Sequence, residues 1–174
     1  MAARFLLQLG DITSMNVEAI VTSSDSTLLG GGPVHMAVHG AAGPGLKAAC
    51  AALEGCPVGE ARITAAYELG ARHIIHTVPP TWIWGSPTEA QALANCYRNS
   101  LELAATQHIR SLAFPSIGSG LQPQIPLEKA APIAVSAILN FLNTHILPEK
   151  VVLVCFDVPT YQAYQRALKE ALPS

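Results

Sequence analysis

The sequence predicts an α/β fold, a three-layer α/β/α sandwich with a mixed central sheet, built as one domain over residues 1–174. Apolar strand-like runs alternate with helix-patterned runs, which is typical of helices packed on a largely parallel sheet. Several of the apolar runs are continuous rather than alternating, as expected for strands covered on both faces. With 174 residues and 50% hydrophobic residues, the chain suits one domain with a large core.

The expected strands are short apolar runs bounded by polar or glycine-containing turns. They cover residues 4–8, 19–23, 62–66, 73–78, 111–114 and 151–156.

Helix patterns occupy the segments between these strands. Ser86 and Glu89 form a capping box with Pro87 at the first helical position, which predicts the start of a long helix. Further helices are expected over residues 33–42, over residues 45–53, from Pro126, and from an N-cap at Asp157 to about Leu172.

Composition excludes several classes of protein. Charged residues make up 13% of the chain and the net charge is −2, against a usual charged share of about 25%. Because no Lys/Arg cluster is present, we expect no long nucleic acid as a partner. No apolar run reaches the roughly 18 residues of a membrane span. We expect a cytoplasmic protein whose four cysteines are free, buried thiols, with no cofactor.

Two glycine-rich loops are the most informative segments. Each follows a strand and precedes a helix, one at Gly30-Gly31-Gly32 and the other at Gly118-Ser119-Gly120. Glycine backbone approaches a ligand closely, and the helix N-terminus behind it favours phosphate. Neither loop holds Lys or Arg, so backbone amides would have to bind the anion. The P-loop, dinucleotide-binding and G-x-S-x-G patterns are all absent.

Ordered motifs along nearly the whole chain resemble the macrodomain family, closest to bacterial members of the MacroD type. They read LGDIT (9–13), VEAIV (17–21), LLGGG (28–32), AVHGAAGP (37–44), CPVGEA (56–61), HIIHTV (73–78), AFPSIGSG (113–120) and VCFD (154–157). The resemblance implies the macrodomain fold and a cleft for ADP-ribose. Many such members remove ADP-ribose from acidic side chains or deacetylate O-acetyl-ADP-ribose.

The resemblance also implies roles for individual residues. Asp11 would accept a hydrogen bond from the adenine amine beside the Ile12 amide, and Phe156 would lie along the adenine face. Both glycine loops would offer amides to the diphosphate, and the ends of these loops would contact the distal ribose. The full ligand-binding set is Asp11, Ile12, Ser24, Asp25, Gly31, Gly32, Val34, Ile117, Gly118, Ser119, Gly120, Leu121, Gln122 and Phe156.

The departures from the family pattern fall where bond cleavage would occur. Asp25 stands in place of the asparagine that holds the distal ribose, and His35 in place of the hydrolase aspartate. Pro33 replaces a glycine, and Gln122 replaces an aromatic residue. We therefore expect an ADP-ribose-binding module that lacks the usual catalytic residues, with ADP-ribose or an ADP-ribosylated protein as its partner.

Two alternatives stay open. In the first, Asp25 and His35 are themselves catalytic, with Asp25 orienting a water and His35 as the general base of an ADP-ribosyl hydrolase or O-acetyl-ADP-ribose deacetylase. In the second, the domain binds a different nucleotide. His35 and His39 have the i, i+4 spacing of metal ligands, but no third ligand is evident, so no metal is expected. The sequence predicts no particular oligomeric state.

Overall fold

A computed structural model describes residues 4–120 and 124–172. The described strands are β1 (Phe5–Leu9), β2 (Ala19–Ser23), β3 (Ala61–Ala65), β4 (His73–Thr77), β5 (Ser111–Pro115) and β6 (Lys150–Cys155). The described helices are α1 (Pro33–Ala42), α2 (Pro44–Ala52), α3 (Pro87–Thr106), α4 (Leu127–Thr144) and α5 (Val158–Ala171), with the 3-10 helix η1 (Ile12–Ser14) after β1. The element bounds predicted from the sequence are met to within one residue, whereas η1 was not predicted.

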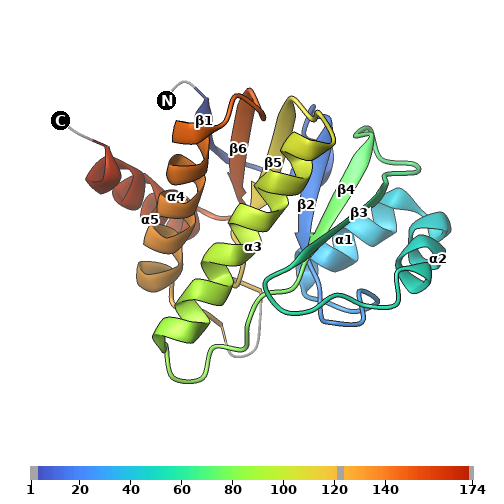
Figure 1. The fold of residues 1–174 in the computed structure, drawn as a ribbon, viewed down its shortest axis with the longest axis horizontal. Coiled ribbons are helices and arrows are strands. Elements are labelled where there is room, and N and C mark those ends of the chain that lie inside the picture. Colours follow the sequence, from blue (N-terminus) through green and yellow to red (C-terminus); the bar gives the residue numbers. More distant parts are fainter. Residues whose placement is uncertain (1–3, 121–123, 173–174) are drawn as a thin grey trace.

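The described strands form one mixed sheet in the order β1-β6-β5-β2-β4-β3 (Figure 1). All neighbouring pairs are parallel except β3 with β4, which pair antiparallel at one edge. The predicted α/β class and mixed sheet are confirmed. Since five strands run the same way, their carboxyl ends meet along one edge of the sheet, where ligands usually bind in such folds.

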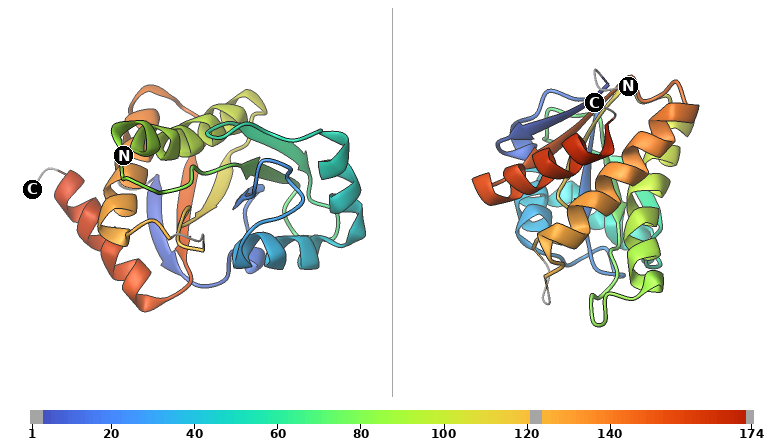
Figure 2. Two further views of the ribbon diagram at one scale, coloured as in Figure 1. Left: turned by 90° about the horizontal axis from the view of Figure 1, so that it is seen from below. Right: turned by 90° about the vertical axis from the view of Figure 1, so that its left-hand side faces the viewer.

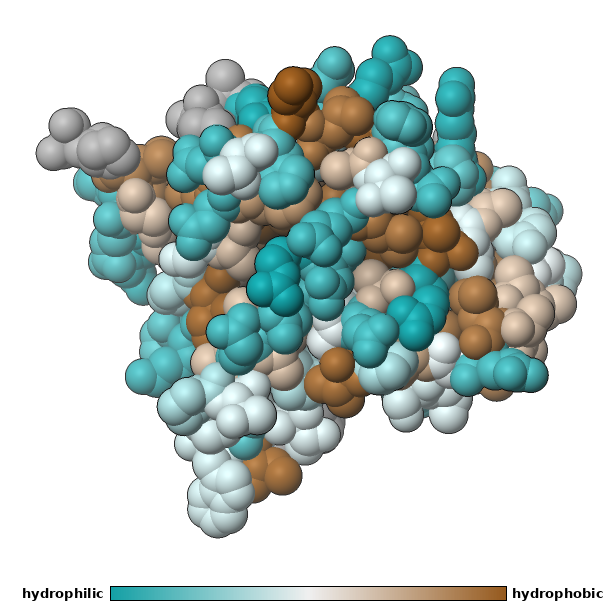
Figure 3. Space-filling view, viewed as in Figure 1, coloured by the Kyte–Doolittle hydropathy of each residue, from teal (hydrophilic) through white to brown (hydrophobic). Residues whose placement is uncertain are grey.

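Helices cover both faces of the sheet and make three layers (Figures 1 and 2). Helices α3, α4 and α5 enclose the larger core, in which Tyr97, Phe114 and Tyr164 are fully buried. Helices α1 and α2 enclose the smaller core, which contains Ile20 and Ile74. The outer surface of α3 in Figure 3 is mainly hydrophilic, as expected of a helix with one apolar stripe toward the sheet.

Two of the helices begin as the sequence predicts. Ser86 Oγ accepts a hydrogen bond from the Glu89 amide at 3.2 Å, and Asp157 Oδ1 accepts one from the Thr160 amide at 2.9 Å. Each side chain therefore satisfies an amide that the first turn leaves unpaired.

The Glu89 carboxylate also fixes the loop before α3. It accepts hydrogen bonds from the amides of Ile83, Trp84 and Gly85 at 2.8–3.2 Å. Trp82 packs against the larger core, while Trp84 is 85% exposed. This loop thus carries one sheltered and one exposed indole.

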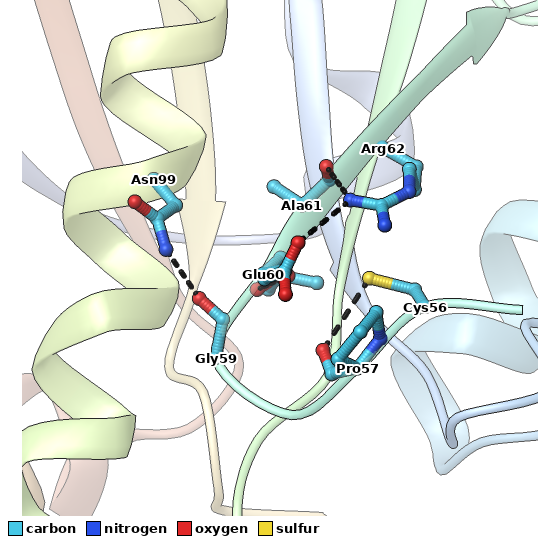
Figure 4. Close-up of polar contacts among 8 residues, drawn as sticks. Cys56, Pro57, Gly59, Glu60, Ala61, Arg62 and Asn99 are labelled. Carbon is cyan, nitrogen blue, oxygen red and sulfur yellow. Dashed lines mark hydrogen bonds and ion pairs between the residues drawn. The ribbon is translucent and has the colours of Figure 1, made fainter.

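The loop between α2 and β3 is fastened to α3 (Figure 4). Asn99 Nδ2 donates to the Gly59 carbonyl at 2.7 Å, and the Arg62 guanidinium donates to Glu60 and to the Ala61 carbonyl. The Cys56 sulfur lies toward the Pro57 carbonyl at 3.5 Å. These contacts hold the edge strand β3 in place.

The four cysteines are free and buried, as predicted. Within the described ranges, no helix combines the length and the apolar character that crossing a membrane requires.

Candidate functional site

A cleft of about 310 Å³ opens at the carboxyl ends of the strands. Its size falls at the lower end of the range usual for small-molecule sites. It is lined by the carboxyl ends of β2, β5 and β6, by the loops after β1, β5 and β6, and by the first turns of α1 and α5. They are Gly10, Asp11, Ile12, Ser23, Gly32, Pro33, Val34, Ala37, Pro115, Ser116, Ser119, Gly120, Gln124, Val154, Phe156, Asp157 and Thr160.

The two glycine loops meet across this cleft. A Cβ atom on Gly32 would lie 2.9 Å from the Gly120 carbonyl oxygen, and one on Gly120 would lie 3.0 Å from Cδ of Pro33. The first approach is shorter than real Cβ contacts and the second is tighter than most of them, so the walls come this close because both residues are glycines. Backbone, with the Pro33 ring beside it, therefore forms this part of the surface.

The first wall ends in the N-terminus of α1. Gly32 is the N-cap and Pro33 occupies the first turn. Proline has no amide, so the amides of Val34 and His35 are the first that the helix leaves unpaired. The positive end of the helix dipole faces the cleft at this point. This arrangement suits an anion even though Pro33 removes one donor.

The second wall is held from behind by buried tyrosines. The Ile117 amide donates to the hydroxyl of Tyr97 at 2.9 Å, and the hydroxyls of Ser116 and Tyr164 are 2.9 Å apart. Gly118 adopts a φ of 99° against Ile125, a left-handed conformation that favours glycine. The loop shape is thus set by the larger core.

One end of the cleft carries carboxylates and an exposed ring. Asp11 Oδ1 caps η1 by accepting hydrogen bonds from the Thr13 amide and hydroxyl at 2.9 and 2.7 Å. Because both bonds engage Oδ1, Oδ2 is the oxygen left for a ligand. The Phe156 ring is 84% exposed beside it. The Thr160 hydroxyl and then the Thr160 amide lower the pKa of Asp157, so this carboxylate is ionised at neutral pH.

Among the described residues that line the cleft, none is Lys or Arg. An anion bound here would therefore meet the N-terminus of α1 and the loop amides, while Asp11 and Asp157, the N-cap of α5, repel it from their end. A ligand with a neutral hydrogen-bond donor at one end and an anionic centre matches this charge distribution.

Asp25 and His35, the two candidate catalytic residues, are both engaged within the protein. Asp25 Oδ1 accepts from the Thr27 amide at 3.0 Å and from the Thr27 hydroxyl, which closes the turn of the first loop. His35 is 2% exposed, and its Nδ1 lies 3.0 Å from Ser24 Oγ. Burial, and next the neighbouring His39, lower the pKa of His35, opposed by Asp25.

His35 lies behind the first loop rather than inside the cleft. A Cβ atom on Gly31 would come within 2.7 Å of the His35 side chain, so the imidazole fills the space beneath Gly31. The described lining of the cleft includes neither Asp25 nor His35. Their catalytic role stays a prediction, and the buried His35 reaches a substrate in the cleft only after a rearrangement.

About half of the predicted ligand-binding residues line the cleft, namely Asp11, Ile12, Gly32, Val34, Ser119, Gly120 and Phe156. Gly31, Ile117 and Gly118 shape its loops, whereas Ser24 and Asp25 belong to the turn behind. Leu121 and Gln122 lie outside the described residues. Ser116 and Thr160 also line the cleft and were not predicted, although Thr160 follows the predicted cap at Asp157 by one helical turn.

A second group of side chains, of the types that bind metals, was not predicted either. His39, Cys50 and His76 bring one ligand-type atom each to within 4.8 Å of one another, between α1, α2 and β4. No local spacing joins these residues, because they belong to three different elements.

Known proteins resemble the chain over nearly its whole length. The family model described as "Macro domain" matches residues 21–134. A macro domain-containing protein of Mesorhizobium japonicum is 48% identical over 95% of the chain and 93% of its own length. A Klebsiella pneumoniae protein named O-acetyl-ADP-ribose deacetylase is 48% identical over 92% of the chain and 93% of its own length. A mutant Oceanobacillus iheyensis macrodomain, solved with ADPR, superposes with a TM-score of 0.89 at 39% identity, covering 94% of the chain and 91% of that structure.

Proposed function

The chain belongs to the macro domain family, and from that premise we propose that its cleft binds ADP-ribose through the adenine and diphosphate without the usual hydrolysis. The observation that carries the proposal is the close meeting of Gly32 and Gly120 at the N-terminus of α1. Two amide-rich walls beside a helix end provide a diphosphate site without any cation.

Selection of adenine is assigned to Asp11 and Phe156. A carboxylate accepts hydrogen bonds only, so Asp11 Oδ2 pairs with the exocyclic amine of adenine and disfavours a carbonyl at the same position. The exposed Phe156 ring offers a face for the base, and stacking of this kind contributes about 1–3 kcal/mol. One end of the cleft thus accepts hydrogen bonds and the other end favours an anion. The adenine amine and the diphosphate of ADP match these two ends.

The lack of the usual hydrolysis follows from the engagement of Asp25 and His35. A general base must reach the proton that it removes, but His35 is buried against Ser24 and Gly31. Asp25 Oδ1 closes the turn with Thr27, and the carboxylate lies outside the described lining of the cleft. An ADP-ribosylated protein is then the natural partner, held by its modification and released unchanged.

One relative favours a second function. The Klebsiella pneumoniae protein named O-acetyl-ADP-ribose deacetylase is as similar to this chain as the relatives named only for their domain. On that basis the alternative is an esterase acting on O-acetyl-ADP-ribose, in which Asp25 and His35 become catalytic once a ligand opens the first loop.

Calorimetric titration with ADP-ribose, ADP and AMP tests the binding proposal. Comparable binding of ADP-ribose and ADP, both tighter than AMP, supports an adenine–diphosphate site. A clear preference for ADP-ribose over ADP means that the distal ribose is also held. If none of the three binds, the proposal is wrong and a screen of other nucleotides becomes the next step.

Turnover is tested separately with an ADP-ribosylated protein and with O-acetyl-ADP-ribose. The proposal expects no product above the uncatalysed rate. Turnover that both Asp25→Ala and His35→Ala abolish, while ADP-ribose binding persists, would instead establish the enzymatic alternative.

A further inference from the structure

A cluster of buried metal-ligand side chains lies on the α1–α2 side of the sheet, apart from the cleft. His39 comes from the last turn of α1, Cys50 from α2 and His76 from β4. Cys50 and His76 are fully buried, whereas His39 is half-buried. The proposed binding of ADP-ribose uses none of these three residues.

The distances place the three donor atoms around a common point. Cys50 Sγ is 3.9 Å from His76 Nδ1 and 3.8 Å from its Nε2, and all three donors lie within 4.8 Å of one another. Three points so spaced always share a position within about 2.8 Å of each, close to the about 2.0–2.3 Å of zinc bonds to nitrogen and sulfur. A contraction of less than about 1 Å completes the coordination.

One nitrogen of the cluster lacks the partner that a buried polar atom needs. Nε2 of His39 is buried, and no described residue forms a hydrogen bond with it. Buried polar atoms are almost always paired. A cation bound through Nε2 supplies the missing interaction.

His76 is prepared as a ligand by its other neighbour. Thr64 Oγ1 lies 2.9 Å from His76 Nε2, which leaves Nδ1, 3.9 Å from Cys50 Sγ, as the nitrogen for a metal. Burial, followed by His39 and His35, lowers the pKa of His76 to about 3. The ring is therefore neutral near pH 7, the form that binds metals, and Thr64 holds its orientation as outer partners of metal-bound histidines do.

We propose that His39, Cys50 and His76 form a binding site for a thiophilic divalent cation, Zn²⁺ in the first instance. One sulfur and two imidazole nitrogens are a usual zinc ligand set, which leaves the fourth tetrahedral position to water or a small anion. Bound there, the cation joins α1, α2 and β4, three elements that otherwise meet through apolar contacts, the edge-on contact of the His39 and His76 rings and the approach of Cys50 Sγ to His76.

Binding releases one proton. Burial raises the pKa of the Cys50 thiol, so the free protein holds Cys50 as S–H. The sulfur gives its proton to solvent as the Zn–S bond forms, while both neutral imidazoles bind through lone pairs. Because the ligands must be deprotonated, binding strengthens as the pH rises.

Titration of the metal-free protein with Co²⁺ and Zn²⁺ tests the proposal. Co²⁺ reports a thiolate ligand through a charge-transfer absorption in the near ultraviolet, and Zn²⁺ displaces it. The expected result is one equivalent of metal per chain, the thiolate band, and loss of at least tenfold in Zn²⁺ affinity in Cys50→Ala. The matched control is Cys56→Ala, since Cys56 is a buried thiol of the same core whose sulfur faces the Pro57 carbonyl (Figure 4).

Two results overturn the proposal. One is the absence of a thiolate band in Co²⁺-loaded wild-type protein, which needs no variant. The other is equal Zn²⁺ affinity of Cys50→Ala and the wild type. If Cys50→Ala does not fold, Thr64→Val replaces it, because removal of that hydroxyl keeps the core shape and lowers metal affinity about 10–100-fold.

Discussion

The sharpest test of the cleft is Gly32→Ala. The added Cβ would lie 2.9 Å from the Gly120 carbonyl oxygen, whereas an ordinary contact begins near 3.4 Å. The two walls must separate by roughly 0.5 Å, because the obstacle is backbone rather than a flexible side chain. Gly32 has a φ of −82°, so alanine is not strained there and the effect is one of space alone.

The expected cost follows from the hydrogen bonds that the walls make with the diphosphate. Amide hydrogen bonds near 2.9 Å reach the limit of useful length when stretched by this amount. A hydrogen bond to a charged group contributes about 1.5–3 kcal/mol. Losing one therefore raises the Kd for ADP-ribose about 10- to 150-fold.

Isothermal titration calorimetry with ADP-ribose measures the change. Gly40→Ala is the matched control: it lies in the same helix, and a Cβ there meets nothing within 4 Å. It keeps wild-type affinity and gains stability of about 0.5–1 kcal/mol, as alanine does over glycine inside a helix. The reasoning is refuted if Gly32→Ala binds ADP-ribose as tightly as the wild type while its melting temperature is also unchanged.

Three further predictions concern stability. Asp157→Ala removes the cap on the Thr160 amide and lowers the free energy of unfolding by about 0.5–2 kcal/mol at pH 7; because the folded pKa of Asp157 is lowered, this loss shrinks as pH falls through that pKa. Tyr97→Phe leaves the buried Ile117 amide unpaired and costs about 1–3 kcal/mol in urea unfolding. The pKa of His76 is about 3 in the folded protein against 6.5 in the unfolded chain, so its neutral ring contributes fully to stability above pH 6.5 and this contribution is lost between pH 6.5 and 3. In His76→Gln, measured with a chelator present, the free energy of unfolding therefore falls less steeply with acid, by up to about 1.4 kcal/mol per pH unit.

Each of these predictions has its own control. Asp157→Asn keeps most of the capping stabilisation because asparagine caps as well as aspartate. Asparagine does not titrate, so this stabilisation does not change with pH. Tyr67→Phe changes an exposed tyrosine and leaves stability unaltered; an equal loss in both tyrosine variants contradicts the role given to Tyr97. An unchanged acid profile in His76→Gln would show that other groups govern the transition.

The fold was predictable because its signals are local. The apolar run Ala19–Val21 and the caps at Ser86 and Asp157 identify strand and helix starts without tertiary information. The partners of the Glu89 carboxylate in the capping box were not predictable in detail. It accepts hydrogen bonds from three loop amides, and the path of that loop depends on what it packs against.

The site divides in the same way. The glycine loops were visible because each lies between a strand and a helix. The direction of His35 was not, since the rotation of α1 about its axis decides whether that side chain meets the cleft or fills the space under Gly31. The meeting of His39, Cys50 and His76 depends on how α1, α2 and β4 pack. Residues brought together in this way have no recognisable spacing in the sequence, although histidine and cysteine are each known as metal ligands.

The loop held by Glu89 contains a tryptophan whose fluorescence can report on the motion of that loop. The chain has two tryptophans, one packed against the core and the other 85% exposed on a turn held by three amides. A collisional quencher such as iodide extinguishes the emission of Trp84 first and leaves the bluer emission of Trp82. Time-resolved anisotropy of the quenchable component then follows the turn, while the residual component follows the core, within one unmodified sample.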